Sequence, residues 1–250
     1  MLAVITGASA GLGQEFARQI AEQFPEIDAL WLIARRIGKL EELAETLPGK
    51  TVRCIGMDLC RSRSYRELSE LLQRERPQIG LLVNNAGCGM LGNVGQASAE
   101  SQMRMVDLNV RALTMVTNAV LPFMPSGAHI INVSSIASFC PTPRMTVYSA
   151  TKSYVSAFTG GLSEELRPKG ITVTAVCPGP MKTEFLEAAA IRDSKAFETL
   201  PYCDPEKVVA GTLKAAKKGR TFYTPTAFYK FYRLVGKLTP MKLMMKATKT

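Results

Sequence analysis

Histidine is almost missing from this chain of 250 residues, and its scarcity limits the chemistry open to the protein. The six cysteines are scattered and form no C-x-x-C pair: Cys54, Cys60, Cys88, Cys140, Cys177 and Cys203. A zinc site or a disulfide framework would need closely spaced or paired ligands, so we expect no metal and free thiols in a reducing compartment. A Ser-His-Asp hydrolase would have to use His129, whose place before the apolar run 130–133 is typical of a strand start.

Long apolar runs are also absent, since no stretch approaches the roughly 18 uninterrupted apolar residues of a membrane-spanning helix. The hydrophobic share of 46% and the charged share of 21% are ordinary for a globular protein. The segment 2–6 directly after Met1 is typical of a first strand, which leaves no room for a cleaved signal peptide. We expect one cytoplasmic domain.

Acidic residues are missing from the C-terminal end, although the whole chain carries a net charge of +10. Lysines and arginines contribute +11 after Glu206, which leaves a net charge of −1 for residues 1–206. The basicity is therefore local, and no recognised nucleic-acid-binding motif accompanies it. We expect no nucleic-acid partner.

Short aliphatic runs alternate with longer amphipathic segments, as in the βαβ units of a parallel sheet. The predicted strands are 2–6, 29–34, 51–57, 80–84, 129–134, 171–177 and 221–223. The predicted helices are 12–24, 39–47, 62–76, 99–123, 147–167 and 205–218. Right-handed crossovers place such helices on both faces, so we predict an α/β, doubly wound (Rossmann) fold with a seven-stranded parallel sheet in one domain, residues 1–225. The irregular segment 182–202 follows the sixth strand and is interpreted as a lid.

A glycine-rich stretch, T-G-A-S-A-G-L-G, occupies positions 6–13 between the first strand and a helix. Gly7 permits the tight turn, Gly11 lets the backbone approach a pyrophosphate, and Gly13 lets the helix pack close to the sheet. The stretch predicts a dinucleotide site; the alternative is that the glycines only make a turn.

The end of the second strand lacks the carboxylate that would bind an adenosine ribose. It reads Leu-Ile-Ala-Arg-Arg, and the guanidinium groups of Arg35 and Arg36 can pair with a 2′-phosphate. The sequence therefore favours NADP(H) over NAD(H). The alternative is that both arginines are solvated loop charges.

Four motifs follow one another in order: T-G-x-x-x-G-x-G at 6–13, N-N-A-G at 84–87, Y-x-x-x-K at 148–152 and Pro178-Gly179. With them the chain resembles the short-chain dehydrogenase/reductase family from Met1 to about Tyr223. The resemblance implies an NADP(H)-dependent enzyme that transfers a hydride between the cofactor and a carbonyl or secondary alcohol.

Tyr148 and Lys152 are four positions apart on a predicted helix, so their side chains share one face. A tyrosine pKa near about 10 is too high for a base at neutral pH, but an adjacent ammonium and a positive nicotinamide would favour the phenolate. The resemblance also gives Lys152 the task of holding the nicotinamide ribose.

Two further residues match the family's catalytic set. Ser135, thirteen positions before Tyr148 and at the carboxyl end of a strand, would hydrogen-bond the substrate oxygen, whereas Ser134 would point to the other side. Asn109 matches the fourth catalytic residue, and an asparagine inside a helix suggests a local kink or a water held for proton relay.

The resemblance extends to further cofactor contacts. Asp58 would bind the adenine amine with Leu59 beside the ring, Asn85 and Gly87 would line the adenosine side, and Thr183 would bind the carboxamide. The complete predicted cofactor site is Gly7, Ser9, Gly11, Leu12, Gly13, Arg35, Arg36, Asp58, Leu59, Asn85, Gly87, Tyr148, Lys152, Pro178, Gly179 and Thr183.

The residues expected to border the substrate are almost all uncharged: Phe139, Pro141, Met145, Cys88 to Leu91, Met181, Phe185 and Leu186. They favour an apolar substrate such as a steroid, fatty or isoprenoid carbonyl; the alternative is that they are ordinary core. The long helices that carry Asn109 and Tyr148 resemble those with which the family forms dimers or tetramers. A non-catalytic NADP(H)-sensing protein is the alternative function, and the presence of Tyr148 and Lys152 disfavours it.

The C-terminal tail, 226–250, mixes apolar residues with cations at helical spacing and predicts a basic amphipathic helix broken near Pro240. Three interpretations remain open. The tail caps the pocket or joins a dimer partner, it lies on an anionic membrane surface as part of a membrane-peripheral lipid carbonyl reductase, or it is a frayed, solvated end.

Overall fold

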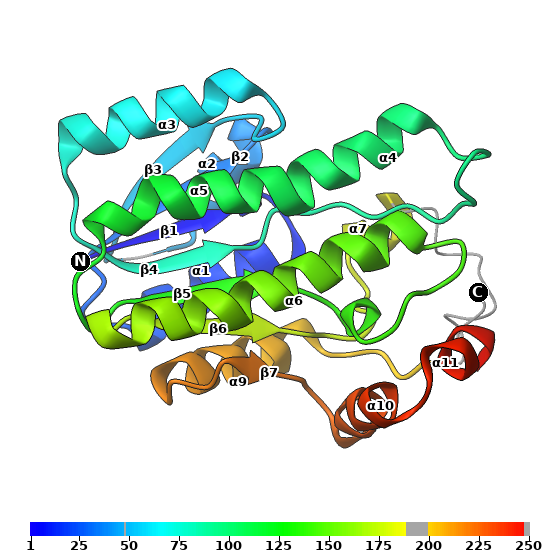
Figure 1. Ribbon diagram of the computed structural model, residues 1–250. Helices are drawn as coiled ribbons and strands as arrows, with labels where there is room; N and C mark the ends of the chain where they lie inside the picture. Colours follow the sequence, from blue (N-terminus) through cyan, green and yellow to red (C-terminus); the bar gives the residue numbers. More distant parts are fainter. Residues whose placement is uncertain (48, 189–199, 248–250) are drawn as a thin grey trace.

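The computed structural model describes residues 1–47, 49–188 and 200–247, in which helices cover both faces of a seven-stranded parallel sheet (Figure 1). The strands are β1 (Leu2–Thr6), β2 (Ala29–Ala34), β3 (Thr51–Gly56), β4 (Ile79–Asn84), β5 (His129–Val133), β6 (Thr172–Val176) and β7 (Phe222–Tyr223). They lie in the order β3-β2-β1-β4-β5-β6-β7, and all neighbouring strands are parallel. The predicted doubly wound fold is confirmed, and each predicted strand agrees with the observed one within a residue at either end.

The α-helices are α1 (Gly11–Gln23), α2 (Ile37–Glu45), α3 (Ser62–Glu75), α4 (Ala99–Val106), α5 (Leu113–Val120), α6 (Thr146–Leu166), α7 (Glu184–Ala188), α9 (Pro205–Lys217), α10 (Ala227–Leu238) and α11 (Met241–Ala247). Short 3₁₀ turns are η2 (Leu121–Phe123), η3 (Ile136–Ser138) and η4 (Arg167–Lys169). The predicted lid, 182–202, is seen only at its two ends, because 189–199 lie outside the described residues.

One predicted helix, 99–123, is interrupted. A π-helical turn, η1 (Asp107–Ala112), separates α4 from α5, and Pro122 lies in the 3₁₀ turn that ends the segment. The wide turn contains Asn109, whose amide bonds the backbone of Cys88 on the loop after β4. The local irregularity expected at Asn109 is therefore present, and a wide turn rather than a sharp break produces it.

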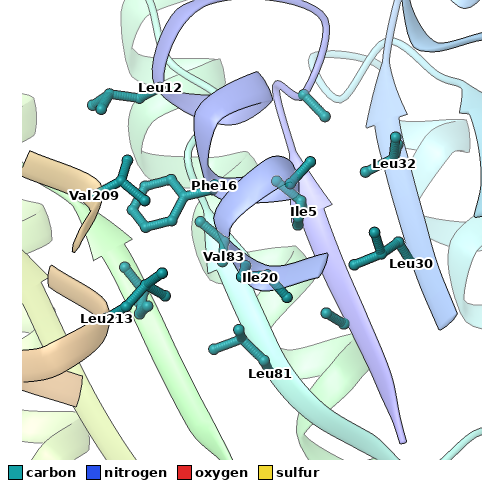
Figure 2. Close-up of a cluster of buried hydrophobic side chains, with 14 of the residues drawn as sticks. Ile5, Leu12, Phe16, Ile20, Leu30, Leu32, Leu81, Val83, Val209 and Leu213 are labelled. Carbon is teal, nitrogen blue, oxygen red and sulfur yellow. The ribbon is translucent and has the colours of Figure 1, made fainter. Parts of the chain in front are cut away.

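The sheet separates two apolar cores. Side chains alternate along β1, so this strand contributes residues to both cores. Ala3 and Ile5 face the core under α1, α2 and α9, whereas Leu2 and Val4 face the core under α3, α5 and α6. Figure 2 shows Phe16 of α1 within the first core. This side chain has no exposed surface, and its burial contributes about 1.5–3 kcal/mol.

The strand order reverses between β1 and β4, so the carboxyl ends of the strands border a crevice at that point. Figure 1 shows α7, α10 and α11 beyond this edge of the sheet. His129 stands at the start of β5, at the opposite edge, where its Nδ1 lies 2.6 Å from Thr172 Oγ1. Burial lowers the pKa of this histidine, and its position confirms the strand-start interpretation.

The tail docks on the domain through α10. Tyr229 is fully buried in the first core, and its hydroxyl donates to the carbonyl of Pro201 at 2.6 Å. A Cβ at Gly179 would lie 2.2 Å from the Tyr229 ring, so this close approach requires glycine. The predicted break is present, since Thr239 and Pro240 separate α10 from α11. Among the described helices, none combines the length and hydropathy needed to cross a bilayer.

Candidate active site

A cavity of about 880 Å³ lies at the carboxyl edge of the sheet. Its wall combines the glycine-rich loop, the ends of β2, β4, β5 and β6, and side chains of α6, α7 and α10. Sixteen of the predicted site residues line it: Gly7, Ser9, Gly11, Leu12, Arg35, Arg36, Asp58, Leu59, Asn85, Gly87, Ser135, Tyr148, Lys152, Pro178, Gly179 and Thr183. Gly13 and Asn109 do not line the cavity, but each contacts residues that do.

The glycine-rich loop is shaped by backbone requirements. Gly7 and Gly11 have φ values of +67° and +54°, which glycine adopts without strain. A Cβ at Gly13 would lie 2.2 Å from the carbonyl oxygen of Gly7, so this glycine lets α1 pack against the loop. The Asn85 amide donates to the carbonyls of Thr6 and Gly7, both at 3.0 Å, and ties the loop to β4.

The start of α1 offers a site for an anion. Its N-cap residue, Ala10, has no side-chain cap hydrogen bond, and acidic residues are missing from the first turn. The N-terminus of a helix carries partial positive charge and unpaired N–H groups, and here it opens on the cavity. The loop therefore fits the pyrophosphate of a dinucleotide.

The two arginines after β2 flank this loop. Arg36 donates to Ser9 Oγ at 3.3 Å and forms an ion pair with Glu184 of α7 at 2.8 Å. Arg35 is exposed and borders the cavity. Both arginines therefore border the cavity, and Arg36 contacts the glycine-rich loop directly. Glu184 is a cavity residue that the sequence did not indicate, because its partner is distant along the chain.

Tyr148 and Lys152 lie on one face of α6, as their spacing predicts. The Ser135 hydroxyl hydrogen-bonds the Tyr148 phenol, and the Lys152 ammonium lies 5.7 Å from the Tyr148 ring centre. Lys152 Nζ donates to the carbonyl of Val133 at 2.9 Å, which anchors it beside the end of β5. The three predicted catalytic side chains therefore meet at one place in the cavity.

The pKa values of this pair differ from the expectation. Burial raises the pKa of Tyr148 to about 12, although the hydrogen bond from Ser135 opposes this shift. Burial also lowers the pKa of Lys152 to about 8. The protein's own groups therefore favour the neutral phenol, and the expected lowering of the Tyr148 pKa by Lys152 is wrong for the protein alone. The cause is desolvation, which disfavours both charged forms.

The neighbouring serines have different partners, as expected for adjacent residues at a strand end. Ser134 Oγ donates to the backbone carbonyl of Lys152 at 2.9 Å and lies 2.8 Å from Ser156 Oγ. Ser135 instead contacts the phenol of Tyr148. The geometry supports the choice of Ser135 as the residue that can meet a substrate oxygen.

Asn109 braces the site without lining it. Its amide accepts from the N–H of Cys88 at 2.9 Å, donates to the carbonyl of Cys88 at 2.8 Å, and donates to Thr151 Oγ1 at 3.0 Å. These bonds join the π-helical turn to the loop after β4 and to α6. A Cβ at Gly87 would lie 3.1 Å from Asn109 Oδ1 and 3.4 Å from Lys152 Nζ, so these groups surround that glycine closely.

The part of the cavity that is predicted to bind adenosine contains charged as well as apolar groups. Asp58 accepts from the N–H of Cys60 at 3.1 Å and lies 3.9 Å from Arg104 Nη2. That nitrogen is buried and has no hydrogen-bond partner, and Arg104 borders the cavity from α4. The sequence offered no signal for Arg104, because an arginine within an amphipathic helix usually faces solvent.

Apolar side chains make the other end of the cavity. Met145, Leu186, Phe185 and Cys88 pack around Tyr148, whose ring centre lies 5.9 Å from that of Phe185. Among the predicted substrate-bordering residues, Cys88, Gly89, Met145, Met181, Phe185 and Leu186 line the cavity. Met90 and Leu91 pack behind this group.

Two predicted substrate contacts are wrong. Pro141 is exposed, and Phe139 packs against Tyr232 of α10 with ring centres 6.2 Å apart. The 3₁₀ turn η3 causes this, because it carries the chain away from the cavity after Ala137. Phe228, Tyr229 and Tyr232 of α10 line the cavity in their place. The helical spacing of these aromatic residues in the tail was the sequence signal that could have indicated them.

Comparisons with known proteins agree with these motifs. The model of the short chain dehydrogenase family matches residues 1–193. An uncharacterised oxidoreductase of Staphylococcus saprophyticus is 33% identical over 187 residues, which cover 73% of this chain and 79% of the relative. An uncharacterised oxidoreductase of Staphylococcus aureus strain N315 is 29% identical over 216 residues, which cover 86% of this chain and 90% of the relative.

Solved structures resemble the whole described domain. A short-chain dehydrogenase from Sphingobium yanoikuyae in complex with NADPH has a TM-score of 0.81 and 31% identity, covering 97% of this chain and 94% of its own. The bulky-bulky ketone specific alcohol dehydrogenase from Comamonas testosteroni has a TM-score of 0.77 and 31% identity, covering 97% and 93%. A Burkholderia phymatum homologue in complex with NAD, at 24% identity, a TM-score of 0.84 and coverage of 100% and 96%, supports the fold alone.

Proposed function

The chain belongs to the short-chain dehydrogenase/reductase family and is an oxidoreductase of that family, and from this premise we propose that it reduces apolar ketones with NADPH. The observation that carries the proposal is the hydrogen-bonded pair of Ser135 and Tyr148 beside Lys152, in a cavity that continues to the glycine-rich loop. The cavity thus joins a proton-donating group to a dinucleotide site.

The residues of this chain fit the dinucleotide. Gly7 and Gly11 shape the loop for a pyrophosphate, and Asp58 and Leu59 border the adenine end. Arg35 and Arg36 support a preference for NADP(H), because their guanidinium groups can form charge-assisted bonds with a 2′-phosphate. The NADPH complex of the Sphingobium yanoikuyae protein is consistent with this preference, whereas the NAD complex of the Burkholderia phymatum protein shows that the same fold accepts the other dinucleotide.

When bound, NADPH supplies the hydride. Tyr148 holds the proton that the substrate oxygen receives, since a phenol with a pKa of about 12 is protonated at neutral pH. Ser135 donates a hydrogen bond to the same oxygen and stabilises the charge that develops there. The protonated phenol is the form that donates a proton during carbonyl reduction, whereas alcohol oxidation needs Tyr148 as a phenolate.

Lys152 and Asn109 position these groups. The Lys152 ammonium is held by the carbonyl of Val133, and its remaining N–H bonds are available to the nicotinamide ribose. Asn109 fixes the loop after β4 through its bonds to Cys88, and a water held beside this residue for proton relay is a further part of the proposal.

The substrate is an apolar and extended carbonyl compound or the corresponding secondary alcohol. Met145, Phe185 and Leu186 surround Tyr148 at this end of the cavity, and none of them carries a charge. The Comamonas testosteroni protein is described as specific for bulky-bulky ketones, which supports the same class here.

A homodimer or homotetramer formed through α4, α5 and α6 completes the proposal. Met103 and Val106 of α4 are 60% and 37% exposed. Exposed apolar side chains of this kind favour a contact between subunits. Light scattering measures this state directly. We also propose that the enzyme works in the cytoplasm.

The test is turnover of bulky apolar ketones with NADPH, followed at the absorbance of the reduced nicotinamide. We expect turnover by the wild-type protein and a loss of about 10²–10⁴-fold in kcat for Tyr148→Phe, with NADPH binding retained. Tyr154→Phe is the matched control, because Tyr154 lies on the same helix at 36% exposure and outside the cavity. Unchanged turnover in Tyr148→Phe would contradict the mechanism.

A further inference from the structure

Exposed apolar side chains form a surface on the two C-terminal helices. It consists of Phe228, Phe231, Leu234 and Leu238 on α10 and Met241 and Leu243 on α11, with exposed fractions between 50% and 76%. We call these six residues the α10–α11 surface. Surfaces of this kind, with several large apolar groups side by side, mark interaction sites rather than ordinary solvent-facing helices.

Contacts on the inner side of α10 keep this surface turned outward. Tyr229 is fully buried, and a Cβ at Gly236 would lie 3.1 Å from the carbonyl oxygen of Phe139. Thr226 caps the helix by accepting from the N–H of Tyr229. Because the inner side is already packed against the domain, rotation of α10 cannot bury the α10–α11 surface.

Cations flank this surface. Lys230, Lys237, Lys242 and Lys246 are all exposed, and none of them forms a salt bridge within the described part of the chain. The sequence contains no aspartate or glutamate after Glu206. An apolar helix face flanked by unpaired lysines has the chemistry of a helix that lies in the headgroup region of an anionic bilayer.

The surface is continuous with the substrate end of the cavity. Phe228 lines the cavity and is also 50% exposed, and Tyr229 and Tyr232 line the cavity from the inner side of the same helix. Figure 1 shows both helices at the carboxyl edge of the sheet, where the cavity lies. A bilayer in contact with α10 would therefore lie next to the cavity.

We propose that the α10–α11 surface docks on an anionic lipid bilayer and that the cavity takes its apolar substrate from that bilayer. The second half of this statement rests on the proposed function, whereas the first half does not. A second copy of the chain is a poorer occupant, because two-fold pairing of this surface would bring lysines against lysines. Negatively charged headgroups neutralise the same lysines.

Binding is measured by co-sedimentation of the full chain with vesicles of phosphatidylcholine, with or without phosphatidylserine. We expect the wild type to sediment with the phosphatidylserine vesicles and to be released by high salt. Lys237→Glu/Lys242→Glu should reduce partitioning about tenfold or more. Lys214→Glu/Lys218→Glu is the control, because it makes the same change of charge at exposed positions at the end of α9 and should have little effect.

A second pair of variants tests the apolar part. Phe231→Ser/Leu238→Ser should also reduce partitioning about tenfold. Val94→Ser replaces a similarly exposed apolar residue outside α10 and α11, at 62%, and should leave binding unchanged. If Phe231→Ser/Leu238→Ser instead dissociates a dimer in light scattering, the surface is an interface between two copies and the proposal is wrong.

Other outcomes are equally decisive. Absence of wild-type binding to phosphatidylserine vesicles at low salt overturns the docking surface, and so does equal loss of binding in the control variants. Turnover of a water-soluble ketone without vesicles should be the same in all four variants. If the proposed function is wrong, this turnover is absent from the wild type as well, whatever the vesicle binding shows. If the substrate is taken from the bilayer, phosphatidylserine vesicles should raise the turnover of a ketone that is dissolved in them. We expect this increase for the wild type and not for Lys237→Glu/Lys242→Glu.

Discussion

The two ends of the cavity are built in different ways. The glycine-rich loop of the cofactor end is shaped by its backbone, through Gly7, Gly11 and Gly13 within one short stretch of chain. The substrate end consists of side chains from α6, α7 and α10, which are distant in sequence. A binding site made of backbone atoms has little freedom to vary, whereas a site made of side chains changes with each substitution. Members of a family can therefore share the mode of cofactor binding and still differ in the substrate that each recognises.

The largest effect should follow from a substitution at the backbone end. In Gly13→Ala the new Cβ lies 2.2 Å from the carbonyl oxygen of Gly7, a backbone atom that cannot give way easily. We expect a cost of about 3 kcal/mol or more in the free energy of unfolding, with loss of NADPH binding. Chemical denaturation and cofactor titration measure the two effects. Gly38→Ala, where the added Cβ meets nothing within 4 Å, is the control.

The corresponding substitution at the side-chain end sharpens the comparison. In Gly179→Ala the new Cβ lies 2.2 Å from the ring of Tyr229, so α10 must move. We expect a cost of about 1–3 kcal/mol in stability and a raised KM for the ketone, with a smaller rise in the Kd for NADPH because Gly179 also belongs to the predicted cofactor site. Steady-state kinetics and cofactor titration separate these quantities. An equal loss of cofactor affinity would show that the two ends are not independent.

Lys152 lies between the two ends, and its pKa predicts a pH dependence of stability. Burial lowers this pKa from 10.5 to about 8, so above about pH 8 the unfolded chain binds a proton that the folded chain has released. The free energy of unfolding therefore rises between about pH 8 and pH 10, by at most about 3 kcal/mol. Tyr148 does not oppose this rise there, because its raised pKa reduces stability only above about pH 10.

Denaturation of the wild type and Lys152→Met across this range checks the expected rise. The variant should lack it, whereas Lys214→Met, at an exposed position of α9, should retain it. Parallel curves for the wild type and Lys152→Met would mean that Lys152 keeps an ordinary pKa despite its burial.

A smaller effect is expected at the ribose end. Arg36→Ala should weaken NADPH binding by about 2 kcal/mol and NADH binding far less, because a charge-assisted bond to the 2′-phosphate is lost. Arg18→Ala removes an exposed arginine from α1, outside the cavity, and serves as the control. Equal weakening of both cofactors would remove the basis for the NADP(H) preference.

The smallest effect concerns the partner of Arg36 on α7. Glu184→Gln breaks an ion pair between groups that are 48% and 59% exposed, and such pairs contribute less than about 1 kcal/mol. Because the freed guanidinium can turn to the 2′-phosphate, NADPH should bind up to about fivefold tighter and NADH unchanged. The two dissociation constants, compared with those of the exposed control Glu22→Gln, measure the effect. Weaker NADPH binding would mean that Glu184 holds Arg36 in position for the phosphate.

The sequence by itself determined the parallel sheet, the glycine-rich loop and the identity of the residues that meet at Tyr148. Periodicity and turn chemistry are local properties, and the four-residue spacing of Tyr148 and Lys152 already places them on one helix face. The tertiary structure alone decided the direction of their pKa shifts, because desolvation depends on everything packed around them. It also decided that Phe139 leaves the cavity, that Arg104 and Glu184 enter it, and that aromatic residues of α10 close its substrate end, since these contacts join segments that are distant along the chain.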